Sequence, residues 1–168
     1  MEITQAKNAV CSPCGFQAAG RASGIKKSGG LDLALLYSQV PALACGVFTK
    51  NTFAAHPVVL CRKHLKGKKA QCIVVNSGNA NCFTGKEGSE VVRKTVSLTA
   101  SLLKIKENLV LTASTGIIGR QMDFTKIKDS LDILAHSLGV KNGNDFARAI
   151  LTTDTRLKEL KTNFLIDG

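Results

Sequence analysis

The most informative stretch of this chain is residues 73–85, where an apolar run turns abruptly into a polar segment: Ile-Val-Val-Asn-Ser-Gly-Asn-Ala-Asn-Cys-Phe-Thr-Gly. An apolar run that ends in turn-forming residues predicts a buried strand. Residues 76–81 hold three asparagines and one glycine, which tolerate a positive φ and offer many hydrogen-bonding groups but little apolar surface. We therefore expect a loop that is ordered by polar contacts, and loops of this kind build sites.

A chain of 168 residues with 44% hydrophobic residues can bury a core as one domain. No apolar stretch approaches the ~18 residues of a membrane span, and residues 1–7 lack the apolar core of a signal peptide. We find no internal repeat, low-complexity tract or interdomain linker in the sequence. One globular unit in the cytoplasm is expected.

The formal net charge of +11 raises the question of nucleic-acid binding. The excess is visible in two clusters: Arg62, Lys63, Lys66, Lys68 and Lys69, and then Lys26 and Lys27. The larger cluster is expected in a short loop, and no aromatic residue lies among its lysines to stack on a base. A solvated loop is favoured over a nucleic-acid site, and attraction to acidic partners or anionic substrates stays open.

Most of the six cysteines lie within apolar runs, which is typical of buried free thiols: Cys11, Cys14, Cys45, Cys61, Cys72 and Cys82. Cys11 and Cys14 have the spacing of a redox pair or of half a zinc site. No second close pair follows them, and the histidines at 56, 64 and 136 are scattered. We expect a turn at Pro13 and no metal site.

Short apolar segments between glycines and charged turns predict strands at 32–37, 43–49, 57–61, 70–76 and 108–113. Thr84 and Glu87 form a capping-box pattern before apolar residues at helical spacing, which predicts a helix over 85–104.

A second helix is predicted over 124–138, with Asp123 or Thr125 as its cap. A shorter helix is expected to begin at Asn144 or Asp145 and to run to Ile150.

The last residues predict a strand at 162–166 followed by Asp167-Gly168, a strong two-residue hairpin signal. A hairpin turn without a returning strand leaves an unpaired edge. We therefore expect either a longer polypeptide or a second chain that completes the sheet.

Several motifs together resemble the bifunctional ornithine acetyltransferase and N-acetylglutamate synthase family of arginine biosynthesis. In chain order they are Gly-Phe-Gln-Ala-Ala-Gly at 15–20 with Gly-Ile-Lys at 24–26, Asp-Leu-Ala-Leu at 32–35, Gly-Val-Phe-Thr-Lys-Asn at 46–51, Asn-Ser-Gly-Asn-Ala-Asn at 76–81 with Thr-Gly at 84–85, Ser-Thr-Gly at 114–116 with Gly119, and Ala-Ile at 149–150 with Thr-Thr-Asp-Thr at 152–155. Each motif alone is weak, and their order carries the resemblance.

The resemblance implies a self-cleaving precursor whose second chain begins with a threonine nucleophile, so that residues 1–168 are the N-terminal, alpha-chain portion. This threonine would take acetyl from N-acetylornithine and pass it to glutamate. Thr115 and Gly116 would form the oxyanion hole, and Thr152 would contact substrate. Residues 76–81 would be a structural loop beside the active site.

The resemblance further implies a mixed α/β fold with sheet and helix layers, and an assembly of two alpha and two beta chains. It implies no cofactor, although use of acetyl-coenzyme A as a second acetyl donor stays open. The chain departs from the family pattern at 122–124, at His56 and at Leu157, but none of these is a named site residue. Two other classes remain: a related self-processing peptidase, and a truncated, non-catalytic binding protein.

Overall fold

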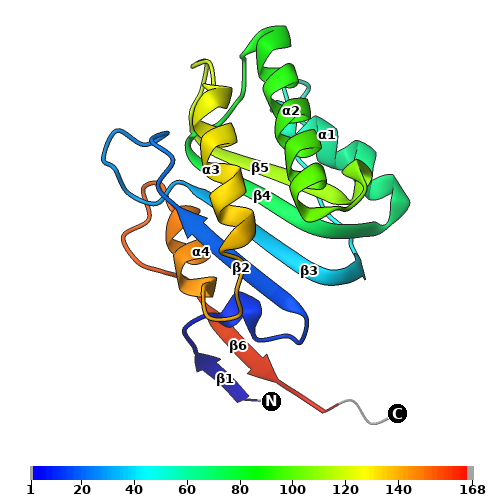
Figure 1. Cartoon of the computed structure of the whole chain (residues 1–168), viewed down its shortest axis with the longest axis vertical. Helices are drawn as coiled ribbons and strands as arrows, with labels where there is room; N and C mark the ends of the chain where they lie inside the picture. The colour runs from blue at the N-terminus through cyan, green and yellow to red at the C-terminus, as the bar shows by residue number, and fades with distance from the viewer. Residues whose placement is uncertain (1, 166–168) are drawn as a thin grey trace.

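The central element of the computed structural model, which describes residues 2–165, is β4 (Lys69–Asn79). It pairs on one side with β3 (Leu33–Leu43), which runs antiparallel, and on the other with β5 (Val110–Ile117), which runs parallel. β2 (Phe16–Arg21) completes the sheet in the order β2-β3-β4-β5 (Figure 1). α2 (Gly85–Leu103) makes the crossover that parallel neighbours require. The mixed α/β class is confirmed.

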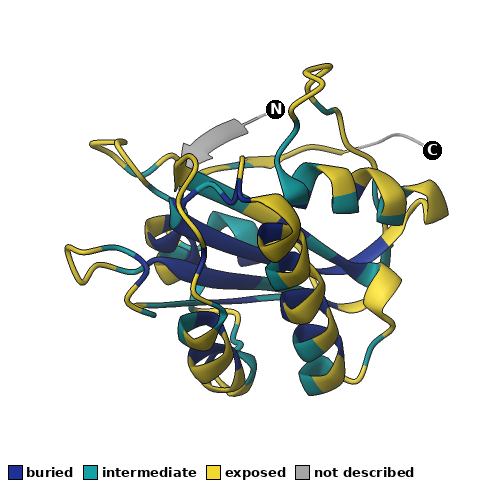
Figure 2. Ribbon diagram, turned by 90° about the horizontal axis from the view of Figure 1, so that it is seen from above, coloured by how far each residue is buried: buried dark blue, intermediate teal, exposed yellow. Residues whose placement is uncertain are grey.

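Both faces of the sheet are covered, which explains why the apolar run of β4 is continuous. Cys72 and Val74 belong to a core that also includes residues of α2 and of α3 (Phe124–His136). Val75 belongs to a second core, on the opposite face, together with residues of α4 (Gly143–Ala149). Figure 2 shows the buried strands between helices whose outer faces are exposed.

The outer edge of β5 is covered by α1 (His56–His64). The Cys61 thiol donates to the carbonyl of Thr112 at 3.1 Å and accepts from the N–H of the same residue at 3.3 Å. His64 Nδ1 lies 2.8 Å from the carbonyl of Val110. These contacts occupy backbone groups that an edge strand would otherwise present to another chain.

Residues 57–61, predicted to be a strand, belong to α1, so that prediction is wrong. Pro57 lies in the first turn, where its fixed φ suits a helix and its missing N–H is not needed. Pro57 and Cys61, four residues apart, are buried, whereas Val59 is 55% exposed. Five residues are too few to separate a period of 2 from one of 3.6. Arg62 and Lys63 consequently lie on a helix and not in a loop.

The predicted strand at 43–49 is also wrong, because β3 ends at Leu43 and residues 44–50 have no regular structure. Val47, the centre of that apolar stretch, is fully exposed in the described part of the chain. The strand predicted at 108–113 is present as β5, but it begins and ends later.

The three predicted helices are present as α2, α3 and α4. Asp123 caps α3 by accepting a hydrogen bond from the N–H of Thr125 at 3.0 Å, which decides between the two predicted caps. The predicted capping box of α2 is wrong. Thr84 lies at the N-cap position, but its hydroxyl donates to Asn81 Oδ1 at 2.7 Å instead.

The ends of the described chain pair with each other: β1 (Glu2–Gln5) and β6 (Leu160–Asn163) form a separate antiparallel sheet of two strands. β6 overlaps the start of the strand predicted at 162–166, and the hairpin turn predicted at Asp167-Gly168 lies outside the described residues. Three short 3-10 helices complete the structure: η1 (Ala9–Cys11), η2 (Leu65–Gly67) and η3 (Glu107–Leu109).

All six cysteines are free thiols, but only half of them are buried. Cys11, Cys61 and Cys72 are buried as expected, Cys82 is partly buried, and Cys14 and Cys45 are exposed. Pro13 lies in a turn, and its carbonyl accepts from the N–H of Phe16 at 3.4 Å. Within residues 2–165, no helix has the length and apolar character needed to cross a bilayer.

Candidate active site

The asparagine-rich segment continues β4 instead of leaving it, because residues 76–79 pair with residues 114–117 of β5. The loop predicted to begin at Asn76 therefore begins later. The predicted polar contacts are present: Asn76 Oδ1 accepts from the Ser114 hydroxyl at 2.5 Å, and Asn76 Nδ2 donates to the carbonyl of Asn79 at 2.8 Å. Asn76 is buried, so these bonds replace the water that its amide loses.

Asn79 joins the end of β4 to the loop that follows β5. Its Nδ2 donates to the carbonyl of Arg120 at 3.0 Å, and its Oδ1 accepts from the N–H of Asn81 at 2.7 Å. The N–H of Ala80 donates to the carbonyl of Ile117 at 3.0 Å. Because Asn79 is buried, this side chain fixes the backbone that carries Arg120.

Asn81 fixes the start of α2 in the same way. Its Nδ2 donates to the carbonyl of Gly88 at 2.9 Å, and its Oδ1 accepts from the Thr84 hydroxyl. Gln121 Nε2 donates to the carbonyl of Thr84 at 3.0 Å. Each asparagine of the segment thus uses both its amide nitrogen and its amide oxygen in structural hydrogen bonds, which favours the structural role expected for it.

Two glycines face each other at the ends of the parallel strands. Gly78 and Gly116 are in register, with φ of +99° and +134°. A Cβ on Gly116 would lie 2.4 Å from the carbonyl carbon of Gly78 and 2.5 Å from the nitrogen of Asn79. Only glycine fits this approach, and the strand ends therefore expose bare backbone.

A pocket of about 570 Å³ includes this glycine pair in its wall, and we call it the Thr115 pocket. It is lined by Ile25, Lys26, Lys27, Ser28, Gly78, Thr115, Gly116, Ile117, Arg120, Thr152 and Thr153. It lies at the carboxyl ends of two parallel strands, which is where open α/β sheets commonly bind ligands.

The three residues that the family pattern singles out, Thr115, Gly116 and Thr152, all line this pocket. The Thr115 side chain is half-buried, and its hydroxyl has no hydrogen-bond partner among the described residues. The place of Thr152 follows from the packing of α4. The buried Ser77 hydroxyl donates to the carbonyl of Ala149 at 2.5 Å, which holds the C-terminal end of α4 against β4.

Thr153 also lines the pocket, whereas Asp154 is held by another contact. The Asp154 carboxylate accepts a hydrogen bond from the Lys158 ammonium group. This hydrogen bond and the positive charge of Lys158 hold the pKa of Asp154 below its usual value. Asp154 is not among the residues that line the pocket.

Asp32, fully buried immediately before β3, organises one wall of the pocket. Its carboxylate accepts from the N–H and hydroxyl of Ser23 at 2.6 and 2.7 Å and from the N–H of Lys26 at 2.8 Å. The Lys26 ammonium group donates to the carbonyl of Leu31 at 2.7 Å. Burial lowers the pKa of Lys26, and the charge of Asp32 acts in the opposite direction.

The wall of the Thr115 pocket contains three cationic side chains, Lys26, Lys27 and Arg120, and no carboxylate among its lining residues. Lys27 and Arg120 are exposed, and their side chains have no ion-pair partner within residues 2–165. Lys26 and Lys27 were part of the charge pattern of the sequence. Arg120 was not singled out there, because its place depends on the hydrogen bond from Asn79 to its carbonyl.

Similar proteins give the site its context. A model of the ArgJ family matches residues 17–168. An "Arginine biosynthesis bifunctional protein ArgJ" of Caldanaerobacter subterraneus subsp. tengcongensis is 43% identical over 168 residues, which cover 100% of this chain and 41% of that protein. A "Glutamate N-acetyltransferase" of Methanocaldococcus jannaschii is 44% identical over 163 residues, which cover 95% of this chain and 39% of that protein. The chain thus spans about two fifths of the length of these relatives.

Solved structures agree with the sequence comparison. An ornithine acetyltransferase from Mycobacterium tuberculosis, solved with ornithine, has a TM-score of 0.89 and 34% identity, over 95% of this chain and 87% of that chain. An arginine biosynthesis bifunctional protein from Bacillus halodurans has a TM-score of 0.83 and 31% identity, over 92% of this chain and 82% of that chain. By its sequence and by its fold, this chain belongs to the ArgJ family.

Proposed function

We propose that residues 1–168 are the N-terminal, alpha-chain portion of an acyltransferase that moves acetyl from N-acetylornithine to glutamate in arginine biosynthesis. The observation that carries this proposal is the convergence of Thr115, Gly116 and Thr152 on one pocket at the ends of β4 and β5. The names of the relatives and the ornithine bound to a solved relative support it.

Thr115 and Gly116 form the oxyanion hole in this proposal. Attack on an acetyl carbonyl places negative charge on its oxygen, and the Thr115 hydroxyl and the Gly116 N–H are donors to that oxygen. The Thr115 hydroxyl has no competing partner among the described residues. The bare backbone of the Gly78 and Gly116 pair allows the acetyl group to approach closely.

The nucleophile is the N-terminal threonine of a second chain, whose own α-amino group takes the hydroxyl proton. The threonine oxygen bonds to the acetyl carbon, the C–N bond of N-acetylornithine breaks, and ornithine leaves with the proton. The glutamate amine then attacks the acetyl ester, N-acetylglutamate leaves, and the threonine hydroxyl re-forms. Both steps develop charge on the same acetyl oxygen, so one oxyanion hole serves both.

Substrate carboxylates account for the positive wall of the pocket. N-acetylornithine carries one carboxylate and glutamate carries two, and all the charged residues that line the pocket are cations. Of the two exposed cations, Lys27 and Arg120, Arg120 is the better carboxylate ligand, because its guanidinium group can bind a carboxylate through two hydrogen bonds. The Thr152 hydroxyl contacts the same substrate from the segment that follows α4.

The active assembly contains two alpha and two beta chains in this proposal, and it needs no cofactor. The use of acetyl-coenzyme A as a second acetyl donor to glutamate is tested separately, with the two-chain protein described next.

The test is to express this chain together with the coding sequence that follows it and to incubate the purified protein with N-acetylornithine and glutamate. Ornithine and N-acetylglutamate should form in equal amounts, and only when both chains are present. An assembled pair that transfers no acetyl group, or that only hydrolyses peptide bonds, would overturn the proposal. Adding acetyl-coenzyme A in place of N-acetylornithine tests the second donor.

A further inference from the structure

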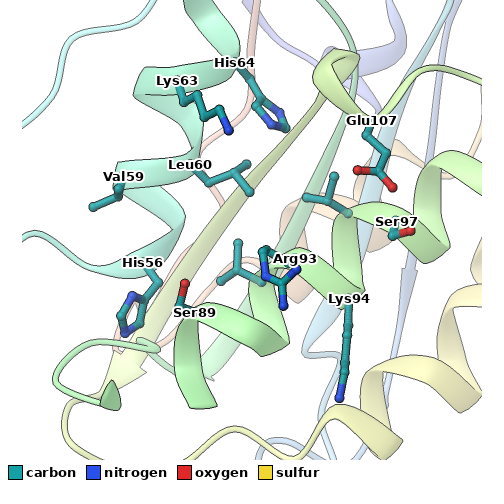
Figure 3. Close-up of a pocket in the computed structure, with 12 residues that line it drawn as sticks. His56, Val59, Leu60, Lys63, His64, Ser89, Arg93, Lys94, Ser97 and Glu107 are labelled. Carbon is teal, nitrogen blue, oxygen red and sulfur yellow. The ribbon is translucent and has the colours of Figure 1, made fainter. Parts of the chain in front are cut away.

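A second hollow, of about 570 Å³, lies between α1 and α2 and shares no lining residue with the Thr115 pocket. We call it the α1–α2 groove, and Figure 3 shows it with its lining side chains. Its volume lies within the range of small-molecule sites. The mechanism proposed above makes no use of this surface.

The groove is built by residues that recur at helical spacing. On α1, Leu60 and His64 are four residues apart and therefore lie on one face, with Lys63 beside them. On α2, Arg93 lines the same space, and the buried side chains of Val92 and Val96 also belong to the lining. The lining therefore combines aliphatic side chains with cationic ones.

Lys63 and Arg93 have no ion-pair partner within residues 2–165, although both are exposed. Lys94 behaves differently, because it pairs with Glu90 at 3.1 Å and lies over the ring of Phe124. In Figure 3 Lys63 extends from α1 toward α2, Arg93 stands on the α2 side, and Lys94 points away. Lys63 and Arg93, the two groove cations without an ion-pair partner in the described part of the chain, therefore face the same groove.

His64 adds a fixed hydrogen-bonding group to the groove. Its Nδ1 lies 2.8 Å from the carbonyl of Val110, and because a carbonyl can only accept, Nδ1 carries the proton. This bond holds the ring on the side of the groove where Lys63 also lies (Figure 3). Glu107 is the one carboxylate in the lining, against the three cations Lys63, Arg93 and Lys94.

We propose that the α1–α2 groove binds a small organic anion that has a doubly charged head and a short apolar body. The head lies between Lys63 and Arg93, since two cations on opposite walls match two negative charges and the guanidinium group can hold two oxygens. The body packs on the half-buried Leu60 and on the methylene stems of Lys63 and Arg93. A purely inorganic anion would leave this aliphatic surface uncovered and would bind more weakly.

The test is calorimetric titration of the full-length protein with hexyl phosphate and with inorganic phosphate, at matched ionic strength. Hexyl phosphate should bind once per chain and about tenfold more tightly than inorganic phosphate, which is the effect of burying roughly two methylene groups. The double variant Lys63→Gln and Arg93→Gln should bind hexyl phosphate at least tenfold more weakly. The control, Lys86→Gln with Lys128→Gln, removes two exposed helix cations outside the groove and should bind normally.

Three results would overturn the proposal. The first is the lack of saturable binding at millimolar hexyl phosphate. The second is equal binding by the groove variant and the control variant. The third is binding that is lost in Arg120→Gln instead, because this places the anion in the Thr115 pocket. The Arg93→Lys variant keeps the charge and should retain part of the affinity, which separates a charge effect from a disturbed fold.

Discussion

Gly78 and Gly116 stand opposite each other on two parallel strands so closely that a single methyl group on Gly116 would lie 2.4 Å from the carbonyl carbon of Gly78. Both residues have a positive φ. The close approach brings the ends of β4 and β5 together beside Thr115, so the pair fixes the geometry of the pocket as well as the packing of the strands.

The Gly116→Ala substitution should therefore lower the free energy of unfolding by about 2–5 kcal/mol, since it adds both a steric clash and an unfavourable φ. Gly119→Ala is the matched control, because Gly119 also has a positive φ of +76° but nothing within 4 Å of a new Cβ. Urea denaturation of the two variants measures the difference. Equal losses of stability would show that φ alone matters and that the close approach does not.

Asn79→Asp should release the loop that carries Arg120. A carboxylate cannot donate to the Arg120 carbonyl, and it would be buried where the amide now lies. We expect a loss of about 1–3 kcal/mol in the free energy of unfolding. Asn108→Asp makes the same chemical change at an exposed residue and should have little effect. An Asn79→Asp protein as stable as this control would contradict the role given to Asn79.

Much of this architecture could be predicted from the sequence, because the apolar runs of β4, α2 and α3 are long enough to show their period. The strand predicted at 57–61 was wrong because a proline followed by four apolar residues fits a helix equally well. The capping box failed for a different reason: the Thr84 hydroxyl is taken by Asn81, a contact that depends on how the β4 segment folds back.

The site residues also fall into those that the sequence predicted and those that it could not. Thr115, Gly116 and Thr152 were found through the order of family motifs, and the structure places them in one pocket. Arg120 and Asp32 could not be assigned to it beforehand. Their places are set by hydrogen bonds to Asn79 and Ser23, which neither charge pattern nor spacing reveals.

Arg120→Gln should raise the KM for glutamate by about 10- to 100-fold, because a charged hydrogen bond to a carboxylate contributes about 1.5–3 kcal/mol. The kcat should change little, since Arg120 binds the carboxylates and not the reacting carbonyl. Arg120→Lys should give an intermediate KM, and Lys86→Gln should leave it unchanged. Steady-state kinetics of the complete enzyme measure the KM and kcat of each variant. An unchanged KM in an active Arg120→Gln enzyme would exclude Arg120 from substrate binding.

Alkaline pH should destabilise the fold through Cys72. Burial raises the pKa of this thiol to about 12, whereas a cysteine in an unfolded chain has a pKa of about 8.5. Between these values the unfolded state loses the proton and the native state keeps it, so stability falls as the pH rises, by up to about 1.4 kcal/mol per pH unit. Below about pH 8.5 this contribution is constant.

The Cys72→Val variant removes this titration and keeps an apolar side chain in β4. Its free energy of unfolding, measured in urea between pH 8 and 10.5, should therefore fall less steeply than that of the original protein. Other groups titrate in both proteins and cancel in the comparison. Parallel curves would show that the Cys72 thiol is not shielded from solvent as its burial indicates.

The most direct test of the central claim is the kcat of Thr115→Ala in the enzyme assembled with its nucleophile-bearing chain. Loss of one oxyanion donor should lower kcat by about 10²–10³, while the free energy of unfolding stays nearly unchanged because the hydroxyl has no partner among the described residues. Thr115→Ser keeps the hydroxyl and should retain most of the activity. A Thr115→Ala enzyme with the kcat of the original protein would contradict the account.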